Sequence, residues 1–425
     1  MRNHPLIRTL INLRGNVRGC VYTEVLWGIP FNLYAPYVSI YMLTLGLKDS
    51  QIGLLTTIGL AFQVFATLMS GSIADKLGRK RTTLIFDILS WSVPSVIWAV
   101  ARDFRYFLVA AIVNSVWRIV DNSWRLLLVE DTDPRLLVDV WSWISISNLA
   151  VGFVAPVTGL LISRFSLVPT MRGLYWLGVV MMTSKFLIMN SMVTETRQGL
   201  VRMKETHHQH LFSVLQGSTG VLKQILHAPA TILVGGVMTT VSITMMIQRT
   251  FWSILITEKL HIPAEHLVIY TFARSATMLL FFFLAMPRLR HVRSHKPMMV
   301  GLLGMIVSQV ILLNVPAGNY ILLLVATILE ACSFPLINTL LEKLIVLSVD
   351  AKERSRIMAL LNMMVLSFTS PFGWIAGQLS GMNRSLPFVL SIFLFAVGGL
   401  LTYLASRFSK EPPAATEIAE PTAQA

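Results

Sequence analysis

Long apolar runs alternate with short polar turns along almost the whole chain. Each run has roughly the 20 residues that a helix needs to cross the hydrocarbon core of a bilayer. We therefore predict an all-α polytopic membrane protein with twelve transmembrane helices in two groups of six, at residues 19–45, 50–74, 82–101, 105–129, 138–163 and 171–193, then 228–257, 265–287, 297–316, 319–347, 356–380 and 386–407.

The longest polar stretch separates the two groups. It contains His207, His208 and His210 among basic residues, and we interpret it as a solvated linker and not as a metal site. The tail is rich in Pro, Ala, Thr and Glu, which is typical of disorder. The predicted organisation is a six-helix half (1–193), a cytoplasmic linker (194–227), a second six-helix half (228–408) and a disordered cytoplasmic tail (409–425).

Composition supports a membrane protein. The chain is 54% hydrophobic and only 13% charged, whereas soluble domains carry about 25% charged residues. The formal net charge is +14, but Lys and Arg concentrate in alternate loops, which indicates topology and not a nucleic-acid partner. This bias predicts a multi-pass plasma-membrane protein, or an inner-membrane protein in a bacterium, with both termini in the cytoplasm.

The turn between the second and third apolar runs carries a glycine-punctuated, charged motif. Gly78 suits a tight backbone because glycine tolerates positive φ. The motif resembles the signature loop of the major facilitator superfamily, with Gly71, Asp75, Gly78, Arg79, Lys80 and Arg81 at its positions. The resemblance implies two pseudo-symmetric six-helix halves, a substrate site near the membrane midplane and alternating access. We expect the loop itself to act as a gate, with Asp75 and the basic residues holding helix ends together.

The predicted helix 105–129 carries the densest polar stripe. Asn114, Arg118, Asp121 and Arg125 are spaced 4, 3 and 4 residues apart, with Asn122 beside them. This spacing places the four on one helical face. One interpretation is a static ion-pair ladder that packs against a neighbouring helix. The other is a cavity wall whose ion pairs change during transport.

Other ionisable and polar groups also lie in apolar runs, where they are costly and mark candidate sites. A desolvated carboxylate favours its protonated form, so Glu24 and Asp121 are predicted proton carriers with Arg118 as their electrostatic partner. A permanent pair between Glu24 and a buried cation is the alternative. Buried cations outnumber buried carboxylates, which favours an anionic or zwitterionic substrate. The further candidates for the substrate and proton pathway are Asn32, Tyr34, Asn148, Lys185, Arg249, Arg274, Glu330 and Asn338.

The predicted helix 138–163 has small residues at helical spacing. Gly152, Pro156 and Gly159 form a helix-packing motif that lets backbones approach closely. The motif partly resembles the Gly-Pro motif of antiporters in the same superfamily, which implies export. Plain helix packing with a proline kink is the alternative.

We therefore expect a secondary transporter that works by alternating access, with proton-coupled efflux of a small amphipathic or drug-like molecule as its function. The alternative is proton-linked transport of an organic anion or other small metabolite, and a remote one is a non-transporting membrane sensor or scaffold. The chain has no phosphate-binding Gly-x-x-x-x-Gly-Lys-Ser/Thr loop, and it lacks a nucleophile or metal cluster expected of an enzyme. We expect no cofactor, with the proton gradient as energy source, and as partners the lipid bilayer and a small-molecule substrate, no nucleic acid, in a monomeric protein.

Overall fold

The computed structural model describes residues 5–133, 136–206, 228–284, 295–348 and 354–408, and every regular element among these residues is helical. The N-terminal helices are α1 (Pro5–Asn12), α2 (Asn16–Tyr34), η1 (Ala35–Tyr37), α3 (Val38–Thr44), α4 (Asp49–Leu77), α5 (Arg79–Asp87), η2 (Ile88–Ser92), α6 (Val93–Ala99), α7 (Phe104–Asn114), α8 (Trp117–Val129), α9 (Leu137–Gly152), α10 (Pro156–Phe165), α11 (Leu167–Met192) and α12 (Arg197–Thr206). The C-terminal helices are α14 (Pro229–Glu258), η5 (Ala264–His266), α15 (Leu267–Leu284), α16 (His295–Leu313), α17 (Tyr320–Ser348), α18 (Arg354–Met382) and α19 (Leu386–Phe408).

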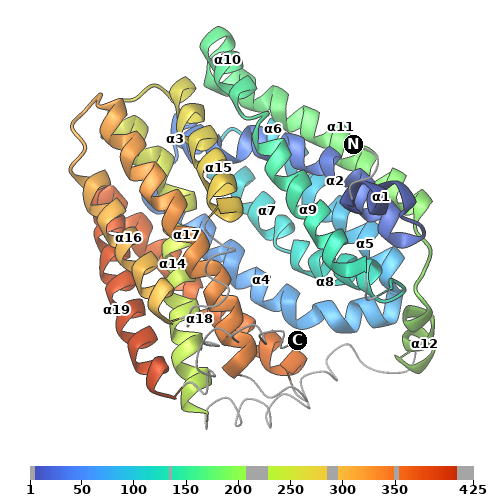
Figure 1. Ribbon diagram of the computed structural model, residues 1–425. Helices are drawn as coiled ribbons and strands as arrows, with labels where there is room; N and C mark the ends of the chain where they lie inside the picture. The colour runs from blue at the N-terminus through green and yellow to red at the C-terminus, as the bar shows by residue number, and fades with distance from the viewer. Residues whose placement is uncertain (1–4, 134–135, 207–227, 285–294, 349–353, 409–425) are drawn as a thin grey trace, which may run out of the picture.

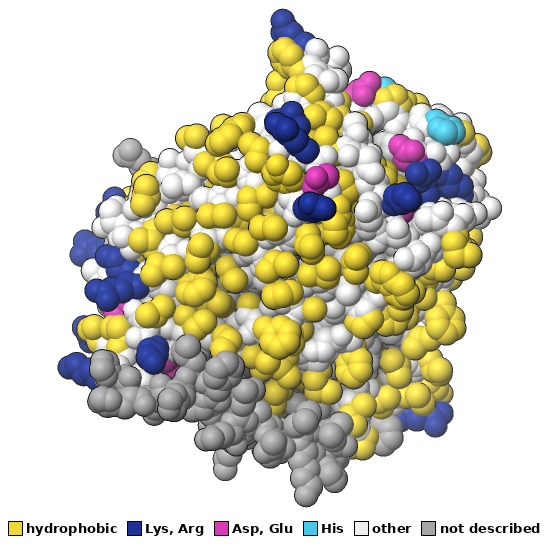
Figure 2. Space-filling view, turned by 180° about the vertical axis from the view of Figure 1, so that it is seen from behind, with side chains coloured by type: hydrophobic (Ala, Val, Ile, Leu, Met, Phe, Trp, Pro, Cys, Tyr) yellow, Lys and Arg dark blue, Asp and Glu magenta, His cyan; other side chains and the backbone are white. Residues whose placement is uncertain are grey.

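Within the described residues, each of the twelve predicted ranges coincides with a helix or with a series of helical segments. Eight helical segments of the described chain are long and apolar enough to cross a membrane, or nine if α11 and α12, which meet at 92°, count as one. Figure 2 shows the outer surface that this composition produces: hydrophobic side chains cover much of the middle of the face, and Lys and Arg gather in its upper part and toward its edges. The histidines of the linker and the tail lie outside the described residues.

Several helices are interrupted where the sequence contains proline or a local polar group. Pro36 lies in the 3-10 turn η1 between α2 and α3, and Pro156 opens α10 after a break that follows Gly152. The element η2 is a π-helical turn inside the helix formed by α5 and α6. Such single turns of wider helix are rare and occur frequently at functional sites.

The helices form two packed groups, which we call the N-terminal helices (α2–α11) and the C-terminal helices (α14–α19). In Figure 1 the first group occupies the right of the molecule and the second the left. The most extensive contact between them joins α4 to α18. A β-carbon added to Gly377 of α18 would lie 2.9 Å from both the Cα of Gly53 and the backbone oxygen of Asp49 on α4, so only glycine permits this approach.

We call the end of the bundle where α4 and α5 meet the linker end, and the opposite end the far end. At the far end, polar contacts join the two groups of helices. Thr57 donates to the backbone oxygen of Ser370 at 2.8 Å, and Ser370 donates back to that of Thr57 at 2.9 Å. The Ser380 hydroxyl donates to Asp49 at 2.6 Å, and Arg384 lies between Asp49 and Glu258, 3.6 and 3.5 Å from their carboxylate oxygens. The far end is therefore held closed.

Candidate transport site

A cavity of about 560 Å³ lies between the two groups of helices. The N-terminal helices contribute a mainly aromatic wall, with Phe31, Asn32, Tyr34, Ala35, Pro36, Val38, Trp91, Trp98 and Asn114. The C-terminal helices contribute the charged wall, with Gln248, Arg249, Trp252, Ser253, Tyr270, Thr271, Arg274, Thr327 and Glu330. Six of the residues predicted for the pathway therefore meet here: Asn32, Tyr34, Asn114, Arg249, Arg274 and Glu330.

The aromatic wall is pre-organised by contacts among its own rings. Phe31 stacks on Trp27 with ring centroids 4.7 Å apart, and Trp91 meets Phe31 edge-on at 5.8 Å. Tyr34 packs against Tyr175 at 4.9 Å, and its buried hydroxyl has no partner among the described residues. Such a wall offers flat apolar surface for a planar ligand.

The charged wall contains one ion pair and one unpaired cation. Arg274 lies 2.7 Å from Glu330, whose other oxygen accepts a 2.9 Å hydrogen bond from the Gln248 amide. Gln309 extends this chain with a 3.4 Å hydrogen bond to Gln248. Arg249 lines the same cavity and is solvent-exposed, and it forms no ion pair with a described residue. The cavity thus holds two guanidinium groups and one carboxylate.

The polar stripe of the predicted helix 105–129 is divided by a break. Asn114 ends α7 and donates to the backbone oxygen of Ser90 at 2.7 Å, whereas Arg118, Asp121 and Arg125 lie on α8. Asp121 pairs with Arg125 at 3.0 Å, and both side chains are substantially exposed, at 34% and 56%. The stripe therefore does not form one continuous ladder, because the two residues between α7 and α8 interrupt the helix.

Arg118 has a different environment from the exposed pair. Its Nε donates to Gln63 at 3.1 Å, and its guanidinium lies 4.1 Å above the Trp117 ring centroid. It makes no ion pair with a described residue, although Asp121, Arg125 and Arg249 act on it electrostatically. Arg249 belongs to the C-terminal helices, so this interaction is a repulsion between cations of the two groups, neither of which forms an ion pair with a described residue.

A second set of buried charges lies within the N-terminal helices, outside the cavity. Lys185 of α11 lies 3.7 Å from Glu24 of α2, with side chains only 6% and 11% exposed. Asp87 of α5 is 2% exposed, and its Oδ2 has no partner among the described residues. We call Glu24, Asp87 and Lys185 the N-terminal charge cluster.

Sequence reasoning missed Asp87, although the criterion applied to Glu24 would have found it. Asp87 lies in the predicted span 82–101, so it is an ionisable group at membrane depth. Its inclusion changes the charge balance of the candidate groups: five cations (Arg118, Arg125, Lys185, Arg249 and Arg274) now stand against four carboxylates (Glu24, Asp87, Asp121 and Glu330).

The signature loop forms a network at the linker end. Gly78 has φ +86°, as its place in the tight turn requires. Buried Arg79 pairs with Asp75 at 2.8 Å and with Glu130 of α8 at 3.1 Å. Glu195 accepts hydrogen bonds from the backbone N–H groups of Arg79 and Lys80 at 2.8 and 3.0 Å, which caps the N-terminus of α5. Arg81 is exposed, and Gly71 has open space around it.

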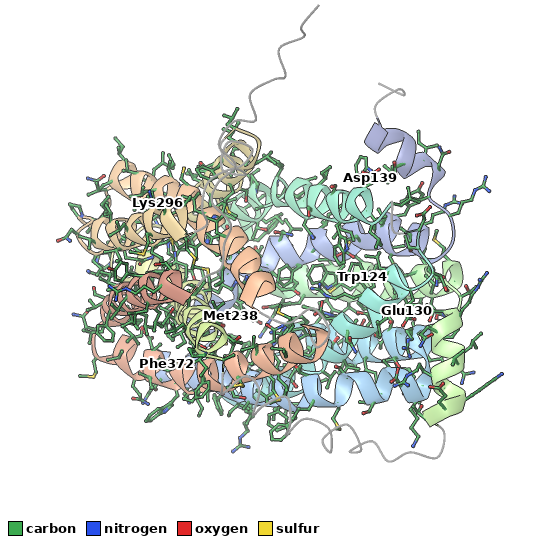
Figure 3. All side chains as sticks on the ribbon, turned by 60° about the horizontal axis from the view of Figure 1, so that its bottom comes forward. Trp124, Glu130, Asp139, Met238, Lys296 and Phe372 are labelled. Carbon is green, nitrogen blue, oxygen red and sulfur yellow. The ribbon has the colours of Figure 1, made fainter. Side chains whose placement is uncertain are left out.

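The short helix α12 docks on this network. Arg202 lies 2.9 Å from Asp75, and its hydrogen bonding to this carboxylate raises the pKa of Arg202 above its ordinary value. Thr196 donates to Glu130. Figure 3 labels Glu130, which follows the last residue of α8, together with Trp124 of the same helix. The loop therefore ties α4, α5 and α8 to the start of the linker, and its predicted role as a gate stays a prediction.

The remaining predicted residues lie away from the cavity walls. Gly152 and Gly159 face the C-terminal helices, since a β-carbon on them would meet Ser275 at 3.4 Å and the Glu265 backbone oxygen at 2.6 Å. Pro156 begins α10 at the kink. The others belong to three different helices: Asn122 on α8, Asn148 on α9 and Asn338 on α17.

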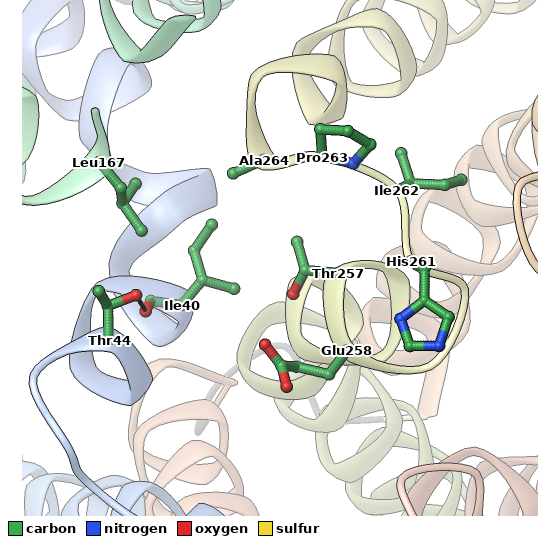
Figure 4. A pocket seen from close by; sticks show the side chains of 9 residues that line it. All are labelled: Ile40, Thr44, Leu167, Thr257, Glu258, His261, Ile262, Pro263 and Ala264. Atoms are coloured by element: carbon green, nitrogen blue, oxygen red, sulfur yellow. Dashed lines mark hydrogen bonds between the residues drawn. The ribbon is translucent and has the colours of Figure 1, made fainter. Parts of the chain in front are cut away.

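A smaller pocket of about 350 Å³ opens at the far end between α3, α11 and the end of α14. Figure 4 shows Ile40 and Thr44 facing Thr257 and Glu258 across it. Glu258 also belongs to the ion-pair chain with Arg384. This pocket lies beside the contacts that close the far end and is separate from the central cavity.

Comparison with known families identifies the chain. Residues 25–373 match the family model of the Major Facilitator Superfamily. The chain belongs to this superfamily. The family and its transporter neighbours identify a multi-pass membrane transporter and not an enzyme. A comparison with curated proteins finds none with significant sequence similarity.

Solved transporters share the fold at low sequence identity. The nucleoside transporter NupG is 14% identical, with a TM-score of 0.70 over 92% of this chain and 98% of NupG. The human organic anion transporter MFSD10 is 14% identical, with a TM-score of 0.60 over 94% and 100%. A bacterial homologue of the lysosomal transporter Spinster, in an inward-facing and occupied conformation, is 11% identical, with a TM-score of 0.64 over 92% and 96%.

Proposed function

We propose that this protein is a secondary transporter of small amphipathic molecules that carry an acidic group, and that it works by alternating access. The observation that supports this best is Arg249, a guanidinium on the wall of the central cavity that has no carboxylate partner among the described residues. Its side chain is exposed to the cavity, so an anionic ligand can compensate its charge, whereas a cationic ligand is repelled.

The two walls are proposed to contact different parts of the substrate. The acidic group of the substrate pairs with Arg249, and its planar apolar part lies against Phe31, Tyr34 and Trp91. Arg118, on the other group of helices, and Arg249 repel each other electrostatically. A bound anion therefore relieves the repulsion between the two groups and favours their closure around the substrate.

Binding of matched ligands tests this assignment. A planar aromatic carboxylate should bind purified protein at least about tenfold more tightly than its neutral amide, which corresponds to ~1.4 kcal/mol. Arg249→Gln should remove that preference, and Arg164→Gln, on the exposed end of α10, is the matched control. Equal affinity of the two ligands for the wild-type protein would overturn the proposal, as would a preference for lipophilic cations.

We further propose that transport is coupled to protons and directed outward, with the linker end in the cytoplasm. The clustering of Lys and Arg in alternate loops supports this orientation, and the closed far end then corresponds to an inward-facing conformation. In proteoliposomes, a pH gradient should drive the carboxylate substrate and protons in opposite directions. Flux that ignores the gradient would argue against coupling, and co-movement would argue against export.

The signature loop is proposed to act as a gate and not as part of the substrate site. Its network involves Asp75, Arg79, Glu130 and Arg202 at the linker end. Asp75→Asn should slow transport several-fold while substrate affinity stays close to that of the wild type. Lost binding with preserved flux would contradict the gating role.

A further inference from the structure

The N-terminal charge cluster has one carboxylate more than it has cations. Glu24 and Asp87 share a single ammonium group, that of Lys185. All three residues are at least nine-tenths buried, with exposed fractions of 9%, 2% and 5%. If both carboxylates are ionised, one negative charge remains uncompensated in the low-dielectric interior. One bound proton removes it.

The geometry shows where that proton belongs. Lys185 is within 3.7 Å of Glu24, which compensates the Glu24 carboxylate. The Oδ2 atom of Asp87 is buried without a partner among the described residues. A protonated Asp87 carries no charge, so it fits this buried environment better than the carboxylate does.

The groups that face Asp87 come from two packed helices. Lys185 of α11 and Glu24 of α2 act on it electrostatically, and Cys20 of α2, a buried thiol, belongs to the same set. The charged residues of α8 interact with one another and with Arg249. From α8, Trp124 lies next to the cluster, with its ring centroid 6.0 Å from the Lys185 ammonium.

The cluster lies outside the cavity but is joined to it through one helical turn. Asp87 is the residue directly before the π-helical turn η2, and Trp91 within that turn lines the cavity. The turn is held at both sides: Ser92 shares a 2.7 Å hydrogen bond with Thr183 of α11, and the backbone oxygen of Ser90 accepts the 2.7 Å bond from Asn114 of the cavity wall. A π-turn is a local departure from the α-helix that a change in neighbouring charge can bias.

We propose that Glu24, Asp87 and Lys185 form a proton-storage site outside the substrate cavity, and that η2 transmits its protonation state to the aromatic wall through Trp91. Loss of the proton leaves Asp87 charged and draws it toward Lys185. This movement pulls on the start of η2 and shifts Trp91 at the cavity. The coupling step rests on the proton-driven transport proposed above, but the storage site itself does not.

Infrared difference spectroscopy tests the storage site without any substrate. Purified wild-type protein in lipid should show a protonated carboxyl C=O band at neutral pH that disappears as the pH is raised. Asp87→Asn should lack this band. The amide is neutral like the protonated acid, and it leaves Glu24 paired with Lys185, so this variant is expected to fold. Asp121→Asn, which removes a carboxylate from an exposed ion pair, is the matched control and should retain the band.

Transport measurements with the same variants test the coupling. Asp87→Asn should retain substrate exchange at equal pH on both sides and lose at least about tenfold in flux driven by a pH gradient. A band that persists in both Asp87→Asn and Glu24→Gln overturns the storage site, as does full gradient-driven flux in Asp87→Asn. If the wild-type protein transports no organic anion while the band behaves as expected, the proposed function fails and the storage site stands.

Discussion

Two buried ion pairs, one in each group of helices, show how similar chemistry serves different purposes. In the C-terminal helices, Arg274 and Glu330 pair on the wall of the central cavity, with a second cation, Arg249, beside them. In the N-terminal helices, Lys185 and Glu24 pair away from the cavity, with a second carboxylate, Asp87. The set at the cavity therefore has one cation in excess, in a place that a substrate can reach. The N-terminal charge cluster has one carboxylate in excess, in a buried place where a proton is the ligand that we propose.

Access to the cavity explains the difference. A charge next to a cavity is partly solvated, and an incoming ligand can compensate it. The side chain of Arg274 is 32% exposed, whereas that of Lys185 is 6% exposed. In the buried N-terminal charge cluster, an excess charge can be compensated by a proton or by a neighbouring side chain.

The largest expected effect is the loss of the single cation in the N-terminal charge cluster. Lys185→Met should lower the free energy of unfolding by about 3–5 kcal/mol, because it leaves the Glu24 carboxylate buried without a cation, next to the proposed protonated Asp87. The unfolding temperature in detergent measures this loss, which should shrink as the pH falls and Glu24 is also protonated. Arg274→Met, next to the cavity, should cost clearly less. Equal losses would remove the distinction between the two sets.

An intermediate effect is expected at the charged wall. Among the described residues that line the cavity, Glu330 is the only carboxylate, and Glu330→Gln removes it while Arg249 and Arg274 remain. Anion affinity should rise about tenfold, or ~1.4 kcal/mol, while turnover falls because the product leaves more slowly. Titration calorimetry and initial flux measure the two quantities. Weaker anion binding would show that Glu330 itself contacts the substrate.

The smallest effect concerns the connection between the two regions. Thr183→Val removes the hydroxyl that bonds Ser92 of η2, which should cost about 0.5–1.5 kcal/mol of stability. Substrate affinity should stay unchanged, while the number of protons moved per substrate falls. The matched control is Thr239→Val, whose hydroxyl bonds only within its own helix, to Gly235 at 2.9 Å. An equal fall in the control would remove η2 from the coupling.

Much of the fold followed from local patterns. Apolar length and polar turns placed the helices within a few residues, and Pro36 and Pro156 lie at real interruptions. The signature loop was recognisable because its tight turn needs specific residues, including Gly78 at φ +86°. Side-chain partners were only partly predictable. The spacing placed both Arg118 and Arg125 within reach of Asp121, and the structure pairs Asp121 with Arg125, whereas Arg118 donates to Gln63 of another helix.

The sequence by itself determined which segments enter the membrane and that several charges lie within them, because hydrophobic burial and helix length are properties of a single segment. The tertiary structure alone decided which charges meet. Glu24 joins Lys185 from 161 positions along the chain, and Arg274 joins Glu330, through the rotation and tilt of whole helices. A helix pattern fixes the face on which a residue lies, but neighbouring helices fix whether that face meets a counter-charge, a cavity or lipid. That choice separates the cation that we propose binds the substrate from the carboxylate that we propose binds a proton.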